Sequence, residues 1–309
     1  MSLRKVNYNQ TRKRFQSTES ASSALTQKSP SSSKVNPPES TRPAPLDLPS
    51  RQPDQSFFSY YFSLGKATLK FYKNGLKAVY TNSQTSLSIR GRLSPSTSIQ
   101  DAVKQNLLSR GEYQLLRRSR QDVLKIPLFA LLFMICGEFT PLVVVFVSGV
   151  VPRTCYIPRQ IESQREKAEK RRKESFRMGT VEEEKGVPTT VGDLNKKALL
   201  HVGASLGLYR SIWDKIGVSI WPPMPLLRSR VRKEVDYLGL DDMAIERDGG
   251  VQGMELDEVK IALEERGLDV LGKNEELLRR SLKEWLGAKE KETVVARLVT
   301  RPSSWRAEK

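Results

Sequence analysis

The residues with the clearest chemical potential in this 309-residue chain are Glu138 and Pro141, because both lie inside a long apolar run. Glu138 is the only acidic or basic side chain between Ile126 and Val151. An acid in such a segment is a candidate for moving protons or cations across a membrane. Pro141 has no N–H, so the carbonyl of Gly137 loses its helical partner. A protonated Glu138 bonded to that carbonyl or to a neighbouring helix is the structural alternative, and both interpretations stay open.

A second set of candidates is the basic residues on either side of the apolar run. Residues 60–127 hold 12 Lys/Arg against 3 Asp/Glu, residues 153–185 hold 10 against 7, and residues 186–309 are nearly balanced. A net charge of +17 is typical of a protein that faces anionic polymers or lipid and unusual for a metabolic enzyme. We therefore predict contacts with ribosomal RNA or lipid headgroups at Arg117, Arg118, Arg120, Lys125, Arg171, Arg172 and Lys173.

Enzymatic and metal-dependent functions find little support in the sequence. The stretch GASLG, which ends at Gly207, fits the G-x-S-x-G pattern of serine hydrolases, and His201 is close by. That pattern requires a strand before the serine and a helix after it, whereas a helix is predicted to end here. With one histidine and two cysteines, the chain has no two-histidine metal motif. We predict that the protein is not an enzyme and that it carries no metal or other cofactor.

The composition of the N-terminal part indicates a targeting segment rather than a folded domain. Residues 1–18 contain five basic residues and no acid, and Ser and Thr dominate the residues that follow. This composition favours a mitochondrial transit peptide over a merely disordered basic tail. Six prolines from Pro37 to Pro53 predict that residues 30–55 form a linker that does not fold. We assign residues 1–55 to the transit peptide and linker.

The apolar run sets the central element of the prediction. The 26 residues of Ile126–Val151 span about 39 Å as a helix, and a bilayer core needs about 20 residues. A single transmembrane helix is therefore predicted over 126–151. A buried core helix, or a hairpin that turns at "GEFTP" with halves too short to span, are the alternatives. A basic amphipathic helical region precedes the run over 56–125, and a charged juxtamembrane helix follows over 152–185.

The C-terminal part predicts a small helical domain over 186–290, followed by a tail over 291–309. Two amphipathic segments, 193–208 and 253–268, each end in a Gly-Leu step typical of a helix C-cap. A second helix follows each of them, and Asn274 is the expected N-cap of the last one. This weak repeat of a helix–loop–helix unit predicts an all-α fold. We expect one small core formed by Leu256, Val259, Leu263, Leu277, Leu278, Leu282 and Trp285.

The order of these segments resembles the LETM family of mitochondrial inner-membrane proteins. The resemblance is carried by "RQDVLK", which leads into the proline-bearing apolar run, and by "EERGLDVLG" and "LLRRSLKEWLG" near the end. The short length is similar to the branch that has the LETM domain but lacks the EF-hand and coiled-coil tail. The resemblance implies one transmembrane helix, a matrix-facing ribosome-binding-like domain and a role in inner-membrane biogenesis.

Three hypotheses follow for the function. The first is an inner-membrane anchor for mitochondrial ribosomes. The second is a subunit of a potassium/proton exchanger, in which Glu138 titrates and homo-oligomers are required. The third is a membrane-shaping protein whose basic flanks bind cardiolipin. The first agrees best with the basic residues around the run, although the nearly neutral C-terminal domain favours protein contacts on the ribosome.

Overall fold

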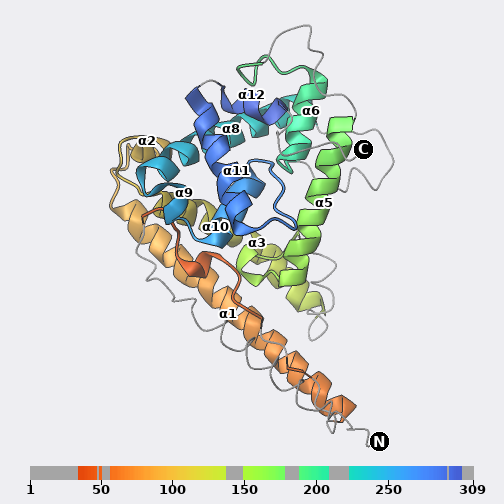
Figure 1. Cartoon of the computed structure of the whole chain (residues 1–309). Coiled ribbons are helices and arrows are strands. Elements are labelled where there is room, and N and C mark those ends of the chain that lie inside the picture. The colour runs from red at the N-terminus through yellow and green to blue at the C-terminus, as the bar shows by residue number, and fades with distance from the viewer. Residues whose placement is uncertain are drawn as a thin grey trace, which may run out of the picture. The chain divides into compact units, whose positions relative to one another are not determined.

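The computed structural model describes residues 34–46, 49–50, 56–136, 149–177, 188–208, 223–290 and 292–300. All regular secondary structure in these ranges is helical, and they contain no strand. The predicted all-α class is therefore confirmed. The described residues belong to one compact unit, which is shown in Figure 1.

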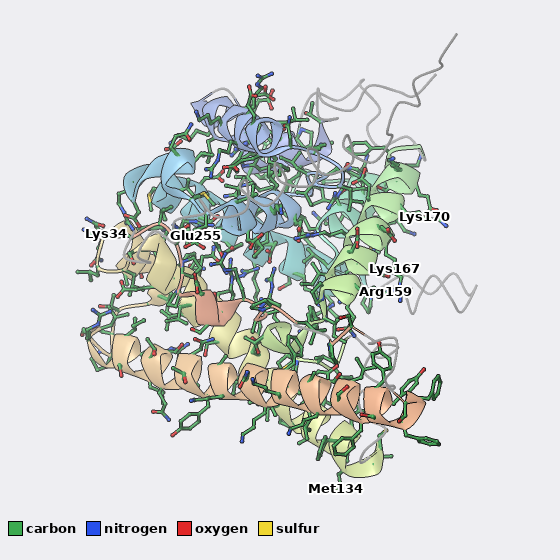
Figure 2. The ribbon with its side chains drawn as sticks, turned by 60° about the horizontal axis from the view of Figure 1, so that its bottom comes forward. Lys34, Met134, Arg159, Lys167, Lys170 and Glu255 are labelled. Atoms are coloured by element: carbon green, nitrogen blue, oxygen red, sulfur yellow. The ribbon has the colours of Figure 1, made fainter. Side chains whose placement is uncertain are left out.

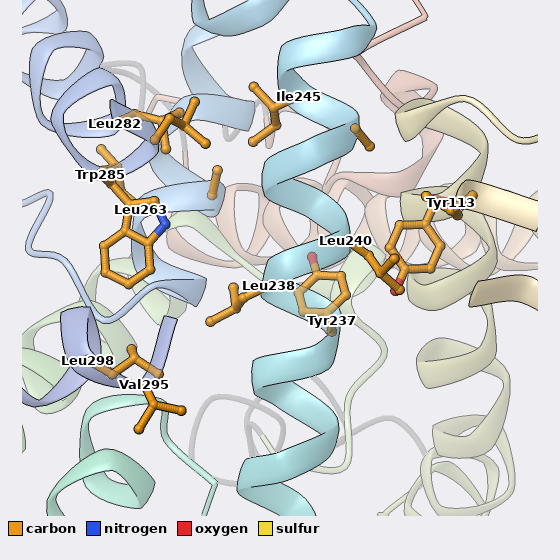
Figure 3. Close-up of a cluster of buried hydrophobic side chains, with 14 of the residues drawn as sticks. Tyr113, Tyr237, Leu238, Leu240, Ile245, Leu263, Leu282, Trp285, Val295 and Leu298 are labelled. Atoms are coloured by element: carbon orange, nitrogen blue, oxygen red, sulfur yellow. The ribbon is translucent and has the colours of Figure 1, made fainter. Parts of the chain in front are cut away.

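The core is built around α8 (Met224–Arg247), which Figure 3 shows passing between the other helices. Leu238 and Ile245 of this helix are fully buried against Leu263 of α10 (Leu256–Glu265) and Leu282 of α11 (Glu275–Gly287). The short helices α9 (Gly250–Gly253) and α12 (Val294–Val299) close this core. Burial of these aliphatic side chains is the main force that holds the described helices together.

The predicted helix ends are confirmed at atomic detail. Gly207 follows α6 (Lys196–Ser205) with a φ of 64°, and Gly267 follows α10 with a φ of 74°. After each glycine a leucine N–H donates back to a carbonyl of the last turn, at 2.9 Å in both cases. This is the Schellman arrangement, which favours glycine because it has no Cβ. The side chain of Asn274 accepts from the N–H of Leu277 at 2.9 Å and caps α11 as expected.

The predicted core is confirmed for most of its members and wrong for Leu277. Val259, Leu263, Leu278, Leu282 and Trp285 are buried, and Leu256 is partly buried. Leu277 is 37% exposed, because it lies on the outer side of the first turn of α11. Adjacent leucines on a helix differ by about 100° in direction, so only one of Leu277 and Leu278 can face the core.

The longest helix, α1 (Phe57–Gly91), packs antiparallel to α3 (Arg110–Cys136). Tyr72 lies 6.2 Å from Phe129 between ring centroids, and Arg92 forms an ion pair with Glu112 near the other end. The short helix α2 (Ile99–Lys104) connects them. These three helices occupy the region for which a basic amphipathic helical region was predicted.

The apolar run is only partly within the described residues. Helix α3 continues to Cys136, and residues 137–148 lie outside the description. Beyond them, the backbone N–H of Arg153 donates to Asp122 Oδ1 at 2.6 Å, and Val151 packs into the same apolar cluster as Phe129. In the ranges that the structure describes, no helix combines the length and the apolarity that a membrane crossing needs. The prediction of a single transmembrane helix over 126–151 thus finds no support.

Residues 34–46, which we predicted to be unfolded linker, are packed onto the helices. Val35 is fully buried, and a turn of 3₁₀ helix, η1, covers Glu39–Thr41. Asn36 donates from its side-chain amide to the carbonyl of Gly253 at 2.8 Å. We call residues 34–46 the N-terminal strap. Its prolines stiffen an extended path over the surface rather than preventing order.

Helix α5 (Pro158–Arg177) begins at a proline, lies within the predicted charged juxtamembrane segment 152–185, and follows the 3₁₀ turn η3 (Arg153–Cys155). It packs against α6. Within α5, Glu169 and Arg172 form an ion pair at 2.9 Å that is almost fully buried. Arg172 also donates to the carbonyl of Ser205 at the end of α6, at 3.4 Å, so each of the two buried charges has a partner.

Candidate functional site

Five exposed cations lie on α6 and on the first half of α8, and we call them the α6–α8 basic surface: Lys196, Lys197, Arg230, Arg232 and Lys233. The two helices are in contact. Arg228 fixes their positions, because its guanidinium donates to the carbonyls of Val191, Gly192 and Leu194 at 2.7–3.1 Å. Arg230 donates to the carbonyl of Leu208, just past the end of α6, at 3.2 Å.

A groove lined by residues of α1, α2 and α3 holds three more arginines. Its walls include Arg90 of α1, Arg117 and Arg120 of α3, and the apolar side chains of Ile99 and Leu116. Arg90 and Arg120 are exposed. The groove therefore offers guanidinium groups next to apolar surface, a combination that suits phosphates, carboxylates and stacked rings.

Arg117 joins the groove to α8. Its Nη2 lies 2.6 Å from Glu234 Oε1, and its guanidinium lies 3.4 Å from the centre of the Tyr237 ring. Burial raises the pKa of Glu234, and Arg117 only partly offsets that effect. The Arg117–Glu234 pair therefore links the groove-lining helix α3 to α8.

The other predicted contact residues are divided between the surface and the interior. Arg120 and Lys173 are exposed, and Arg171 is partly buried. Arg172 is buried, with Glu169 as its partner. Lys125 is partly buried, with its ammonium 5.3 Å from the centre of the Tyr156 ring. Figure 2 shows three further cations of α5, Arg159, Lys167 and Lys170, pointing away from the helices.

Arg118 lies in the interior rather than at a surface. It forms a two-pronged pair with Glu258 of α10, at 2.7 and 2.8 Å, and both side chains are almost completely buried. Arg118 can therefore position α3 against α10, and in this fold it does not reach a partner molecule. Its neighbour Arg110 is buried in the same way beside Asp241, at 2.9 Å.

Asp241 connects this ionic cluster to the rest of the domain. It accepts from Arg110 of α3, from Gln114 at 2.7 Å and from Arg266 at 2.8 Å. Burial alone would raise the pKa of Asp241, but the two arginines outweigh that effect and hold the carboxyl well below its usual range. Ionic contacts thus join α3, α8 and the end of α10 into one unit.

His201 and Ser205 form no catalytic arrangement. The Ser205 hydroxyl lies 3.5 Å from Nε2 of His201, and the Ser175 hydroxyl lies 2.8 Å from Nδ1. Within the described residues the side-chain hydrogen bonds of His201 go to these two serines and not to a carboxylate, and His201 and Ser205 are both buried. No group of three or more His, Cys, Asp or Glu in the described part of the chain is arranged to hold a metal ion.

Because it is buried, His201 predicts a pH dependence of stability. Desolvation lowers its pKa from 6.5 to about 4, so folding favours the neutral ring. This contribution is complete above about pH 6.5 and is lost as the pH falls toward 4. We expect the chain to lose about 2 kcal/mol of stability between pH 7 and pH 5 from this group alone. Urea unfolding at both pH values should show a correspondingly smaller loss in His201→Gln, and an equal loss would contradict the prediction.

The ion-path candidates Glu138 and Pro141 lie outside the described residues. Sequence reasoning missed the α6–α8 basic surface, although the stretch RSRVRK before Glu234 carries four cations in six residues. From the sequence alone, we assign this stretch only to a second helix.

Comparison with known protein families finds two matching regions in the chain. Residues 206–299 match the family model for the LETM1-like ribosome-binding domain, and this match includes α8 to α12. Residues 88–201 match the pentamidine resistance factor domain, which includes α2, α3, α5 and most of α6. No curated protein and no solved structure matches the chain.

Proposed function

Since the chain belongs to the LETM family through its ribosome-binding domain at residues 206–299, we propose that it attaches ribosomes to the mitochondrial inner membrane. The match of this domain is the observation that carries the proposal. The domain would face the matrix, and the apolar run would hold the protein at the lipid. In this role the protein supports the delivery of newly made chains to the membrane.

The α6–α8 basic surface is the part of the structure that best fits ribosomal RNA. It offers five exposed cations on two helices whose relative position Arg228 fixes through three carbonyls. Three of the five, Arg230, Arg232 and Lys233, lie inside the matched domain. Contacts of lysine and arginine with phosphates release counterions, so such binding weakens as salt is added.

Neutralising part of this surface tests the proposal. We expect the triple variant Arg230→Gln/Arg232→Gln/Lys233→Gln to bind purified mitochondrial ribosomes at least about tenfold more weakly at low salt. The slope of log affinity against log salt should fall by about 2 if all three cations contact phosphates. Both quantities can be measured by co-sedimentation of the full chain in detergent.

A matched control comes from α5. The variant Arg159→Gln/Lys167→Gln/Lys170→Gln removes the same charge from exposed positions outside the matched domain. It should bind nearly as well as the natural chain. Equal weakening by both triple variants would indicate a general effect of charge, and no binding by the natural chain would refute the proposed function.

A further inference from the structure

The two ends of the apolar run are held together on the same part of the structure. Asp122 precedes the run, and its carboxylate accepts the backbone N–H of Arg153, which follows it, at 2.6 Å. The Lys125 ammonium lies 3.3 Å from the hydroxyl of Tyr156. Residues from both ends, Phe129 and Val151, pack in one apolar cluster. The chain therefore leaves and returns at the same place.

This return limits how deep the run can reach. Only 21 residues separate Phe129 from Val151, so about ten are available in each direction. Backbone exposed to lipid must satisfy its own hydrogen bonds, and a single segment does so only as a helix. Ten helical residues extend about 15 Å, which is half of the roughly 30 Å hydrocarbon core.

Helix α1, which packs along α3, adds an exposed apolar stripe. Its members recur at spacings of four and seven, so they share one face, and each is at least 37% exposed: Phe58, Phe62, Leu69, Leu76, Tyr80 and Leu87. The described end of α3 is similarly bare, with Met134 81% and Ile135 74% exposed. Figure 2 shows Met134 at the end of α3, which packs beside α1.

The charges of α1 identify the partner of this stripe. Lys66, Lys70, Lys73 and Lys77 are exposed, and residues 57–91 contain no Asp or Glu. Lysines beside an apolar stripe rich in Phe and Leu are typical of helices that lie in the plane of an anionic membrane. A second copy of α1 would bring more lysines to the same face with no acid to pair them, so self-association is disfavoured.

We propose that α1 and the apolar end of α3 lie in one leaflet of an anionic membrane, so that the residues on both sides of the apolar run remain on the same side of the bilayer. The inference rests on the membrane attachment proposed above and is independent of ribosome binding. The lipid class is an anionic phospholipid, whose headgroups would meet the lysines of α1.

Topology is tested by labelling cysteines on both flanks of the run. Cys136 is replaced by Ala, and Cys155 is kept because it is buried. Gln121→Cys before the run and Arg159→Cys after it are both exposed positions. In sealed vesicles of phosphatidylcholine with about one cardiolipin in five lipids, both should react with a membrane-impermeant maleimide added outside. Protection of one of them until detergent is added would show that the run crosses and would overturn the proposal.

Contact of α1 with lipid is tested with a fluorescent probe in the same vesicles. We expect a probe on Leu69→Cys, in the stripe, to be quenched by spin-labelled lipid. A probe on Thr81→Cys, on another exposed side of α1, should stay in water. Equal quenching of both probes would refute lipid contact. A probe at Leu69→Cys that is shielded from water but not quenched by spin-labelled lipid would also refute it, and would indicate a protein partner.

The lysines provide a second variant that leaves the stripe intact. Lys66→Gln/Lys70→Gln/Lys73→Gln/Lys77→Gln should lose at least half of the quenching at Leu69→Cys in cardiolipin vesicles. If that quenching is unchanged, the lysines do not select anionic lipid and this part of the proposal fails. Ribosome binding is measured separately on these vesicles, so its failure would count against the proposed function alone.

Discussion

Replacing Arg118 with Met is expected to lower the free energy of unfolding by about 3–5 kcal/mol, because it leaves Glu258 buried without its main partner. The pair has a two-pronged geometry at 2.7 and 2.8 Å, and Glu258 is fully buried. Burial alone would raise the pKa of Glu258, but Arg118 outweighs it, so the carboxyl titrates below its ordinary value. The natural chain should therefore lose this advantage as the pH falls below about 4.

Two control variants test whether the loss comes from the unpaired buried charge. The double variant Arg118→Met/Glu258→Leu should recover most of the lost stability, since it removes both buried charges. Glu276→Ala, which breaks an exposed pair with Arg280, should cost less than about 0.5 kcal/mol. Chemical unfolding followed by circular dichroism measures all three. An unchanged free energy of unfolding in Arg118→Met would contradict the burial of this arginine.

The second large effect is expected from Trp285→Ala, which should cost about 3–5 kcal/mol. The indole is 7% exposed and lies in the core between α8 and α11, as Figure 3 shows. Its N–H donates to Asp242 at 3.1 Å, and the guanidinium of Arg297 lies 4.4 Å from its ring. The substitution therefore removes a large apolar volume and one donor to a buried carboxylate.

A graded series separates these two contributions. Trp285→Phe keeps much of the ring but not the N–H, so we expect an intermediate loss. Leu277→Ala, at the exposed position on the same helix, should cost much less than a buried leucine. Thermal unfolding of the full chain is the measurement. Equal melting temperatures for Trp285→Ala and Leu277→Ala would contradict the core position of the indole.

Local signals in the sequence predicted the helical class and several helix ends correctly. Gly207, Gly267 and Asn274 act through contacts within one turn of their own position, so a single sequence contains all the information they need. The burial of Trp285 could also be predicted, because it follows Leu278 and Leu282 at helical spacing.

Contacts between distant residues were not predictable in this way. Arg118 looks like a surface cation in the sequence, and only the carboxylate 140 residues further on makes its burial possible. The return of the chain from Arg153 to Asp122 is likewise a tertiary feature, and hydropathy alone does not reveal it. The prediction of a single transmembrane helix therefore depended on information that the sequence alone does not contain.

The N-terminal strap has a consequence for the order in which the molecule can be completed. Asn36 bonds to Gly253 and Glu255, and Arg42 pairs with Glu255, so the strap closes onto segments made more than 200 positions later. A chain that is synthesised or imported from its N-terminus cannot pack the strap in its final position until α10 is present. Proteolysis near the N-terminus meets a matching constraint. A cut before Lys34 preserves the closure, whereas a cut beyond Arg42 removes it.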